Sequence, residues 1–182
     1  MALKEYVILV DETDTEVGRE EKLKAHELGL LHRAFSVFLF RKVKNEIQLL
    51  IQQRAKHKYH CGGLWANTCC SHQQEGESSI DAGKRRLIEE MGVDVEALFE
   101  VGLVTYKAVF DNGLTEHEID HILIGRFDGE EIAYNKDEVE AAEWVALPVL
   151  ERAFSLQQNT FTPWFPLAYN SIPKRAIDRL FT

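Results

Sequence analysis

The chain has 182 residues and a formal net charge of −9 at pH 7. Nucleic acid and anionic membrane surfaces repel so acidic a protein, and we expect neither as a partner. No apolar run approaches the ~20 residues that a membrane-spanning helix needs. The length fits a single domain over residues 1–182 with its own core, as a monomer or a weak homodimer that binds small molecules.

Cysteine usage and the N-terminal sequence indicate a cytoplasmic protein. Cys61, Cys69 and Cys70 cannot all pair, and a bridge between the two neighbours would strain the backbone. Residues 1–10 place charges before a short apolar run and lack the longer apolar core of a signal peptide. Reduced thiols are therefore expected.

Short runs of β-branched and aromatic residues predict strands at residues 6–10, 35–40 and 47–53. A basic segment follows at residues 54–60 and contains Arg54 and Lys58. Local positive charge of this kind can bind an anion even in an acidic protein, although a solvated basic loop has the same composition. Both interpretations stay open on composition alone.

A helix is predicted at about residues 79–91. Ser78 and Ser79 give a start signal, the interior is rich in Ala, Leu, Arg and Glu, and Gly92 gives a stop. Arg86 and Glu90 lie four residues apart and so share one face of this helix. Alone, such a pair is commonly a surface ion pair that contributes little stability.

The second half of the chain predicts a hairpin, a further strand and two helices. Strands at 101–110 and 118–127 flank Asn112-Gly113, a strong tight-turn signal. Because strand side chains alternate, Glu116 and Glu118 project to one face and His117 to the other. A strand at 140–145 and helices at 147–154 and 166–180 complete a mixed α/β pattern.

The densest group of chemically active residues precedes and includes the predicted helix. Against the pattern G-x5-E-x7-R-E-U-x-E-E-x-G-U, in which U is apolar, the chain departs at Ser71 and Arg86. It matches at Glu77, Arg85, Leu87, Glu89, Glu90, Gly92 and Val93. The stretch resembles the Nudix box, which implies a Nudix-like fold with a mixed sheet flanked by helices on both faces.

The arginine at position 86 stands where the Nudix pattern has a glutamate. Divalent cations such as Mg²⁺ prefer oxygen ligands, so a guanidinium in place of a carboxylate weakens a multi-metal cluster. Arginine instead favours bidentate capture of phosphate oxygens. The substitution therefore indicates a site that holds a diphosphate rather than one that cleaves it.

A more specific resemblance covers nearly the whole chain. Residues 31–36, 65–72, 116–118 and 162–165 are similar to those of type I isopentenyl diphosphate isomerases. That family implies conversion of isopentenyl to dimethylallyl diphosphate, in isoprenoid biosynthesis, by proton addition and removal through a tertiary carbocation. Such chemistry requires a proton source on one side of the alkene and a base on the other.

The resemblance implies a role for each of thirteen residues. One divalent metal, Mn²⁺ or Zn²⁺, would be held by His26, His32, His72, Glu116 and Glu118. A Mg²⁺ ion bound to the substrate diphosphate would be held by Glu90 and the backbone near Cys70. The diphosphate would be neutralised by Lys22, Arg54, Lys58 and Arg86. The catalytic residues would be Cys70, Glu118 and Tyr106, with Trp164 lining the pocket.

Each of these residues also has a structural alternative. Lone histidines are commonly surface or capping residues, and His26 and His32 are six residues apart where some relatives have seven. Free cysteines and large aromatics commonly pack in cores. His57, His60, His117 and His121 match no metal position of the family and are interpreted as structural or surface residues.

Two other functions fit parts of the sequence. A Nudix hydrolase of a nucleoside diphosphate derivative would use Glu77, Glu89 and Glu90, but Arg86 disfavours it. A non-catalytic zinc or diphosphate-binding module would use His26, His32, Cys69, Cys70 and His72, and structural zinc would favour a closed site of four ligands rich in thiolate.

Overall fold

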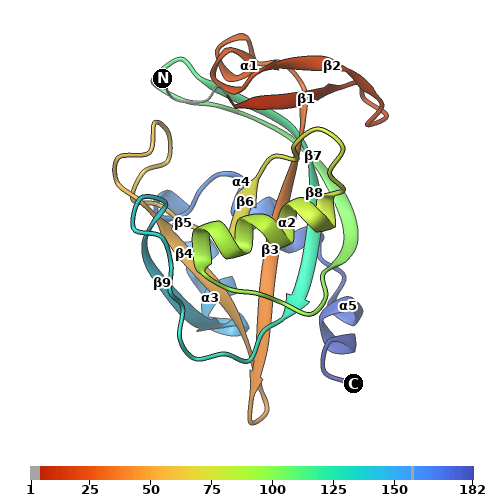
Figure 1. Cartoon of the computed structure of the whole chain (residues 1–182). Coiled ribbons are helices and arrows are strands. Elements are labelled where there is room, and N and C mark those ends of the chain that lie inside the picture. The colour runs from red at the N-terminus through yellow and green to blue at the C-terminus, as the bar shows by residue number, and fades with distance from the viewer. Residues whose placement is uncertain (1–4, 157) are drawn as a thin grey trace.

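The long strand β3 (His32–Val43) is the axis of the fold (Figure 1). It runs antiparallel to β4 (Glu46–Arg54) and β6 (Cys69–Ser71), and parallel to β8 (Thr115–Arg126). This computed structural model describes residues 5–156 and 158–182. Within them the strands form one nine-stranded mixed sheet.

The remaining elements extend this sheet or cover it. They are β1 (Tyr6–Val10), β2 (Glu16–Glu21), α1 (Lys22–Leu28), β5 (Trp65–Ala66), α2 (Ser79–Arg86), the π-helix η1 (Leu87–Met91), β7 (Phe99–Val109), β9 (Val139–Ala146), α3 (Leu147–Leu156), the 3-10 helix η2 (Gln158–Thr160), α4 (Trp164–Ser171) and α5 (Lys174–Arg179). None of the helices in the described ranges is both long and apolar enough to cross a membrane.

Helices cover both faces of the sheet because the side chains of β3 alternate between two apolar clusters. Phe35 and Val37 belong to the cluster under α2 and η1, together with Leu87. Phe38 and Phe40 belong to the opposite cluster, which includes residues of α3, α4 and α5. Figure 1 shows α2 on one side of the sheet and α3 and α4 on the other. The predicted mixed α/β architecture is confirmed.

Most predicted strands are confirmed, with wider bounds. Residues 6–10 match β1, and the strands predicted at 35–40 and 47–53 lie inside β3 and β4. The hairpin is formed by β7 and β8, with Gly113 in the left-handed region at φ 84°. The predicted strand at 140–145 lies inside β9.

The prediction of one helix over residues 166–180 is wrong, because the segment divides into α4 and α5. Pro173 has no backbone N–H, and it pushes the preceding residue out of helical geometry. Ile172 accordingly adopts an extended conformation at φ −70°, ψ 120°. The elements β2 and α1 were not predicted, since both are short and largely polar.

The helix predicted at 79–91 is present, but its last part is the π-helix η1. Ser78 caps its N-terminus by accepting a hydrogen bond from the Asp81 N–H at 3.1 Å. Gly92 ends it at φ 63°, and a Cβ there would lie 2.4 Å from the Ala133 carbonyl oxygen. Glycine is therefore required at this position both by backbone conformation and by close packing.

Candidate active site

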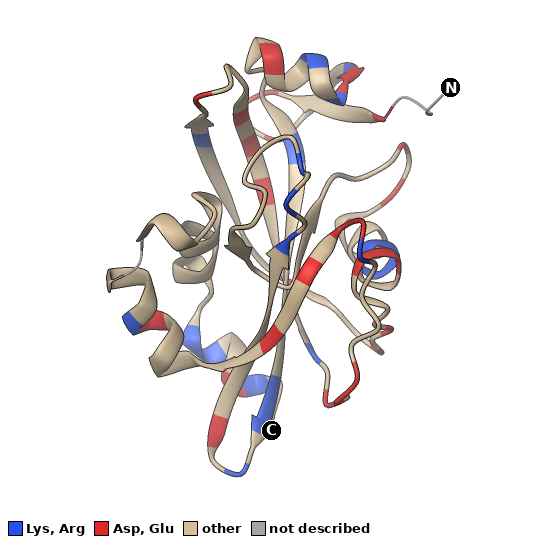
Figure 2. Ribbon diagram, turned by 90° about the vertical axis from the view of Figure 1, so that its left-hand side faces the viewer, with Lys and Arg blue, Asp and Glu red and all other residues tan. Residues whose placement is uncertain are grey.

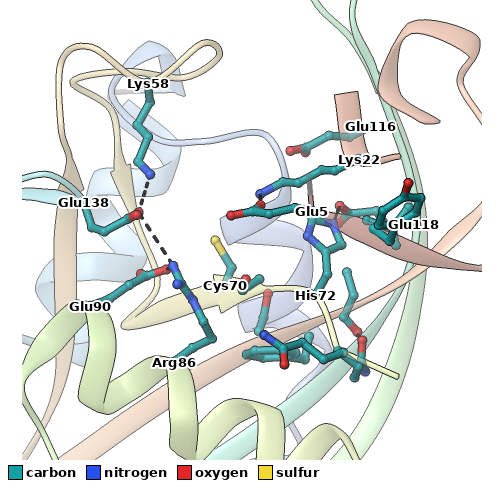
Figure 3. A pocket seen from close by; sticks show the side chains of 18 of the residues that line it. Glu5, Lys22, Lys58, Cys70, His72, Arg86, Glu90, Glu116, Glu118 and Glu138 are labelled. Atoms are coloured by element: carbon teal, nitrogen blue, oxygen red, sulfur yellow. Dashed lines mark hydrogen bonds and ion pairs between the residues drawn. The ribbon is translucent and has the colours of Figure 1, made fainter. Parts of the chain in front are cut away.

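A cavity of about 1040 Å³ opens beside β6 and α2. Eleven of the thirteen predicted site residues line it, and His26 and His32 lie fully buried behind its wall. Figure 3 shows side chains from α1, β6, α2 and β8 converging on this space. Sequence-distant elements thus meet at one cavity, as the resemblance implied.

Parallel pairing of β3 with β8 builds the histidine and glutamate cluster, since it sets His32 directly beside Glu118. Nitrogen and oxygen atoms of His26, His32, His72 and Glu118 lie within 4.8 Å of one another. His72 Nε2 is 3.1 Å and His32 Nε2 is 3.3 Å from the same Glu118 oxygen. Glu116 lies two residues before Glu118 on the same face of β8, as predicted, and both are buried rather than exposed on the hairpin.

Backbone contacts orient two of these imidazoles toward the cluster. His26 Nδ1 lies 2.6 Å from the Lys22 carbonyl oxygen, and His32 Nδ1 lies 2.8 Å from that of Leu30. A proton on each Nδ1 leaves the lone pair of Nε2 free inside the cluster, the usual arrangement of a metal-binding histidine. Burial lowers the pKa of His26, and that of His72 to about 3, so both rings are neutral. The donor set therefore fits a divalent metal.

The pKa values of the two glutamates are shifted in opposite directions. Burial opposes ionisation of Glu118, but the facing imidazoles of His32 and His72 hold its pKa well below the usual range. Burial and the neighbouring Glu118 charge raise the pKa of Glu116. Tyr106, opposite Glu118 in the β7–β8 register, donates to Glu118 and also lies 3.1 Å from Glu116. Glu118 is thus the ionised carboxylate of the pair.

Cys70 lines the cavity from β6, and Glu118 lines the same cavity from β8. Burial raises the pKa of Cys70 although the nearby charge of Arg54 lowers it, so the thiol keeps its proton at neutral pH. Arg54 Nη1 lies 4.0 Å from the sulfur, and its guanidinium lies 5.4 Å from the centre of the Trp164 ring. A protonated thiol and an ionised carboxylate therefore face one cavity.

Three of the predicted diphosphate-binding cations are paired with carboxylates. Lys22 lies 2.9 Å from Glu5, Lys58 contacts Glu138, and Arg86 contacts Glu90 (Figure 3). Figure 2 marks the Lys and Arg positions in blue and the Asp and Glu positions in red along the strands and helices. A phosphate group that binds these cations in the cavity would compete with these carboxylates for them.

The basic segment at residues 54–60 divides between the cavity and solvent. Arg54 and Lys58 line the cavity, whereas Lys56 is exposed and lies outside its lining. His60 was interpreted as structural or surface, and it is buried, with its Nε2 3.1 Å from Glu116 Oε1. No short-range spacing in the sequence indicates this contact, because Glu116 lies on another strand.

The box residues Glu77, Glu89 and Glu90 are held by two arginines. Arg85 donates to both oxygens of Glu77 at 2.6 and 2.9 Å and lies 3.2 Å from Glu89. Arg86 contacts Glu90 and lies 2.9 Å from Glu89. These carboxylates already have cationic partners, which disfavours a cluster of several metal ions on this helix.

Comparison with known proteins agrees with this geometry. The NUDIX domain family model matches residues 30–165. The chain belongs to this family. It is 47% identical over 169 residues to an isopentenyl-diphosphate Delta-isomerase of Photobacterium profundum, covering 91% of this chain and 93% of the relative. It is 48% identical over 163 residues to one of Burkholderia multivorans, covering 90% of each. The resemblance to this group of enzymes is confirmed.

Solved structures show the same fold at low sequence identity. DR0079 from Deinococcus radiodurans aligns with a TM-score of 0.68 and 20% identity over 92% of this chain and 99% of that protein. The NUDIX domain of Shewanella oneidensis NrtR, solved with ADP ribose, aligns with a TM-score of 0.61 and 16% identity over 82% and 87%. These matches support the Nudix fold alone.

Proposed function

We propose that this chain is an isopentenyl-diphosphate Delta-isomerase, acting in the cytoplasm as a single domain over residues 1–182. The observation that carries the proposal is the shared cavity of a protonated thiol, Cys70, and an ionised carboxylate, Glu118. The named relatives, at 47% and 48% identity over about nine-tenths of the chain, support the same activity.

The proposed reaction moves one proton in and another out. One of the pair Cys70 and Glu118 donates a proton to the terminal CH₂ carbon, whose π electrons form the new C–H bond and leave a tertiary carbocation. The other removes a proton from the carbon next to the cation, and that C–H electron pair becomes the new double bond. Tyr106, hydrogen-bonded to Glu118, fixes the carboxylate.

The cavity wall must also exclude water, because water would react with the carbocation. Trp164 is nearly fully buried and donates from Nε1 to Asn67 Oδ1 at 3.2 Å, which fixes its ring. A fixed indole stabilises a nearby cation through its face by about 2 kcal/mol in a dry site. Trp164 is therefore proposed to line the part of the pocket that holds the hydrocarbon.

Binding of the diphosphate is assigned to the basic side chains Lys22, Arg54, Lys58 and Arg86. When bound, divalent ions would supply positive charge, as Mg²⁺ beside Glu90 for the diphosphate and as Mn²⁺ or Zn²⁺ at the histidine–glutamate cluster. His26, His32, His72, Glu116 and Glu118 would hold the latter. A mixed nitrogen and oxygen donor set suits such ions better than Ca²⁺.

Hydrolysis of a nucleoside diphosphate derivative is the competing function. Nudix hydrolysis uses several box carboxylates to bind metal, and here Arg86 replaces one of them while Arg85 pairs with Glu77 and Glu89. We therefore expect little pyrophosphatase activity on nucleotides.

The test is NMR in heavy water with isopentenyl diphosphate and magnesium. The isomerase should place deuterium in the product methyl group without releasing phosphate. Cys70→Ala and Glu118→Gln should each lower turnover by about 10²–10⁴-fold, the range of general acid–base catalysis. His117→Gln, on the opposite face of β8, is the matched control. Near-wild-type rates in either active-site variant, or phosphate release from nucleotides alone, would overturn the proposal.

A further inference from the structure

His60 is a buried imidazole beside the predicted metal cluster, in the loop between β4 and β5. Its ring stacks on Phe110 at 5.1 Å with an interplanar angle of 6°, and lies 5.9 Å from the His26 ring. Only 7% of the residue is exposed. Its Nε2 lies 3.1 Å from Glu116 Oε1, and its Nδ1 is buried without a hydrogen-bond partner in the described structure.

The position of this ring is comparable to that of His72. Each imidazole has its Nε2 3.1 Å from an oxygen of one of the two glutamates, His72 with Glu118 and His60 with Glu116. In both rings Nδ1 is buried without a partner among the described residues. Two histidines thus flank the two carboxylates in the same manner.

A second group of possible metal-binding atoms contains His60. Donor atoms of His26, His60 and Glu116 lie within 4.8 Å of one another, and His26 also belongs to the group with His32 and His72. His26 offers only Nε2, since its Nδ1 is bound to the Lys22 carbonyl. One imidazole lone pair binds one ion, so the two groups surround a single cation position rather than two.

We propose that His60 is a fourth imidazole ligand of this cation, which makes a set of four histidines and two glutamates. The inference rests on the proposed histidine–glutamate metal site and adds a ligand to it. Six donors match an octahedral shell. Because imidazole suits zinc, cobalt and nickel better than manganese or magnesium, His60 should shift the preference of the site toward the former ions.

Replacement of His60 by glutamine distinguishes a metal ligand from a residue that only donates a hydrogen bond to Glu116. His60→Gln keeps an N–H that can donate to Glu116 but removes the imidazole lone pair. His60→Phe keeps a ring against Phe110 and removes both polar functions. His57→Gln changes an exposed histidine of the same loop and is the matched control. Urea unfolding of each variant establishes that it is folded before metal is added.

The experiment loads the full-length protein with Co²⁺ and records the visible absorption spectrum, then measures Zn²⁺ and Mn²⁺ affinities by competition with a chelator. Loss of a ligand should alter the Co²⁺ spectrum of His60→Gln and His60→Phe. It should also weaken Zn²⁺ binding by at least the ~10–100-fold typical of lost supporting contacts. Mn²⁺ affinity should fall less, and His57→Gln should match the wild type.

Each other outcome overturns the assignment. An unchanged Co²⁺ spectrum with weaker binding in His60→Phe alone would make His60 a positioning residue for Glu116. Unchanged spectra and affinities in both variants would remove it from the site. A wild-type protein that isomerises its substrate with Mg²⁺ but binds no Co²⁺ would refute the metal cluster while leaving the proposed activity intact.

Discussion

Replacement of Arg86 by methionine should destabilise the protein more than a substitution at an exposed helix position usually does. The Arg86 side chain is 19% exposed and contacts Glu90, whose side chain is only 6% exposed. Without the guanidinium, Glu90 keeps a hydrogen bond from Gln52 Nε2 at 3.1 Å and a contact with the buried Cys69 thiol, and both partners are uncharged. A buried carboxylate would thus lose its countercharge.

The magnitude lies between two limits. An exposed ion pair contributes about 0–1 kcal/mol, and removal of one partner from a fully buried pair costs about 3–5 kcal/mol. Because a fifth of Arg86 is exposed and Gln52 remains, we expect Arg86→Met to lower the free energy of unfolding by about 2–3 kcal/mol. Arg86→Met with Glu90→Gln should lose about 1 kcal/mol less than the sum of the single variants.

Urea unfolding followed by circular dichroism measures these differences. Arg126→Met is the control, because Arg126 and Asp128 form a 2.6 Å ion pair with both side chains 52% exposed. That variant should stay within about 0.5 kcal/mol of the wild type. A loss below 0.5 kcal/mol for Arg86→Met, or simple additivity with Glu90→Gln, would refute the buried-charge reasoning.

Three further changes test other parts of the structure. Gly92→Ala should lower stability by about 2 kcal/mol or more, since its φ of 63° and a backbone carbonyl 2.4 Å from the added Cβ both oppose a side chain; Gly18→Ala, with open space around it, should be near neutral in the same urea assay. Burial raises the pKa of Cys61 to about 12 and also raises that of Cys70. Iodoacetamide at pH 8 should therefore label both thiols slowly until the protein is unfolded. Rapid labelling of Cys70 in the folded protein would contradict a protonated thiol. Thr68→Val should cost about 1–3 kcal/mol in unfolding free energy because the hydroxyl bridges backbone groups of β3 and β4 at 2.9 and 2.5 Å, whereas Thr68→Ser should retain most of that stability.

Patterns local in sequence predicted the fold well. Short runs of β-branched and aromatic residues located β3, β4 and β8, because each strand buries side chains against helices. The start at Ser78 and the stop at Gly92 bounded the box helix. The π-helix within that helix and the break at Pro173 were not predicted, since the former depends on tertiary packing and the latter interrupts a segment whose composition is otherwise helical.

The candidate site could not be derived from local spacing. His26, His32 and His72 lie on α1, at the start of β3 and after β6, and no short motif joins them. The family resemblance predicted their convergence, and the structure brings them together. His60 was missed by both routes, because its contact with Glu116 depends on a loop whose path has no periodic signal. The catalytic and ligand roles stay predictions until the variants are measured.

The side-by-side pairing of His32 with Glu118 ties completion of the proposed cation site to the order of protein synthesis. Parallel strands so distant in sequence must close a long loop, so they assemble slowly and late. A ribosome-bound chain that has exposed His26, His32 and His72 still lacks Glu116 and Glu118. The proposed site can therefore be completed only after β8 has left the exit tunnel, and an ion bound earlier would meet flexible imidazoles that offer no selectivity.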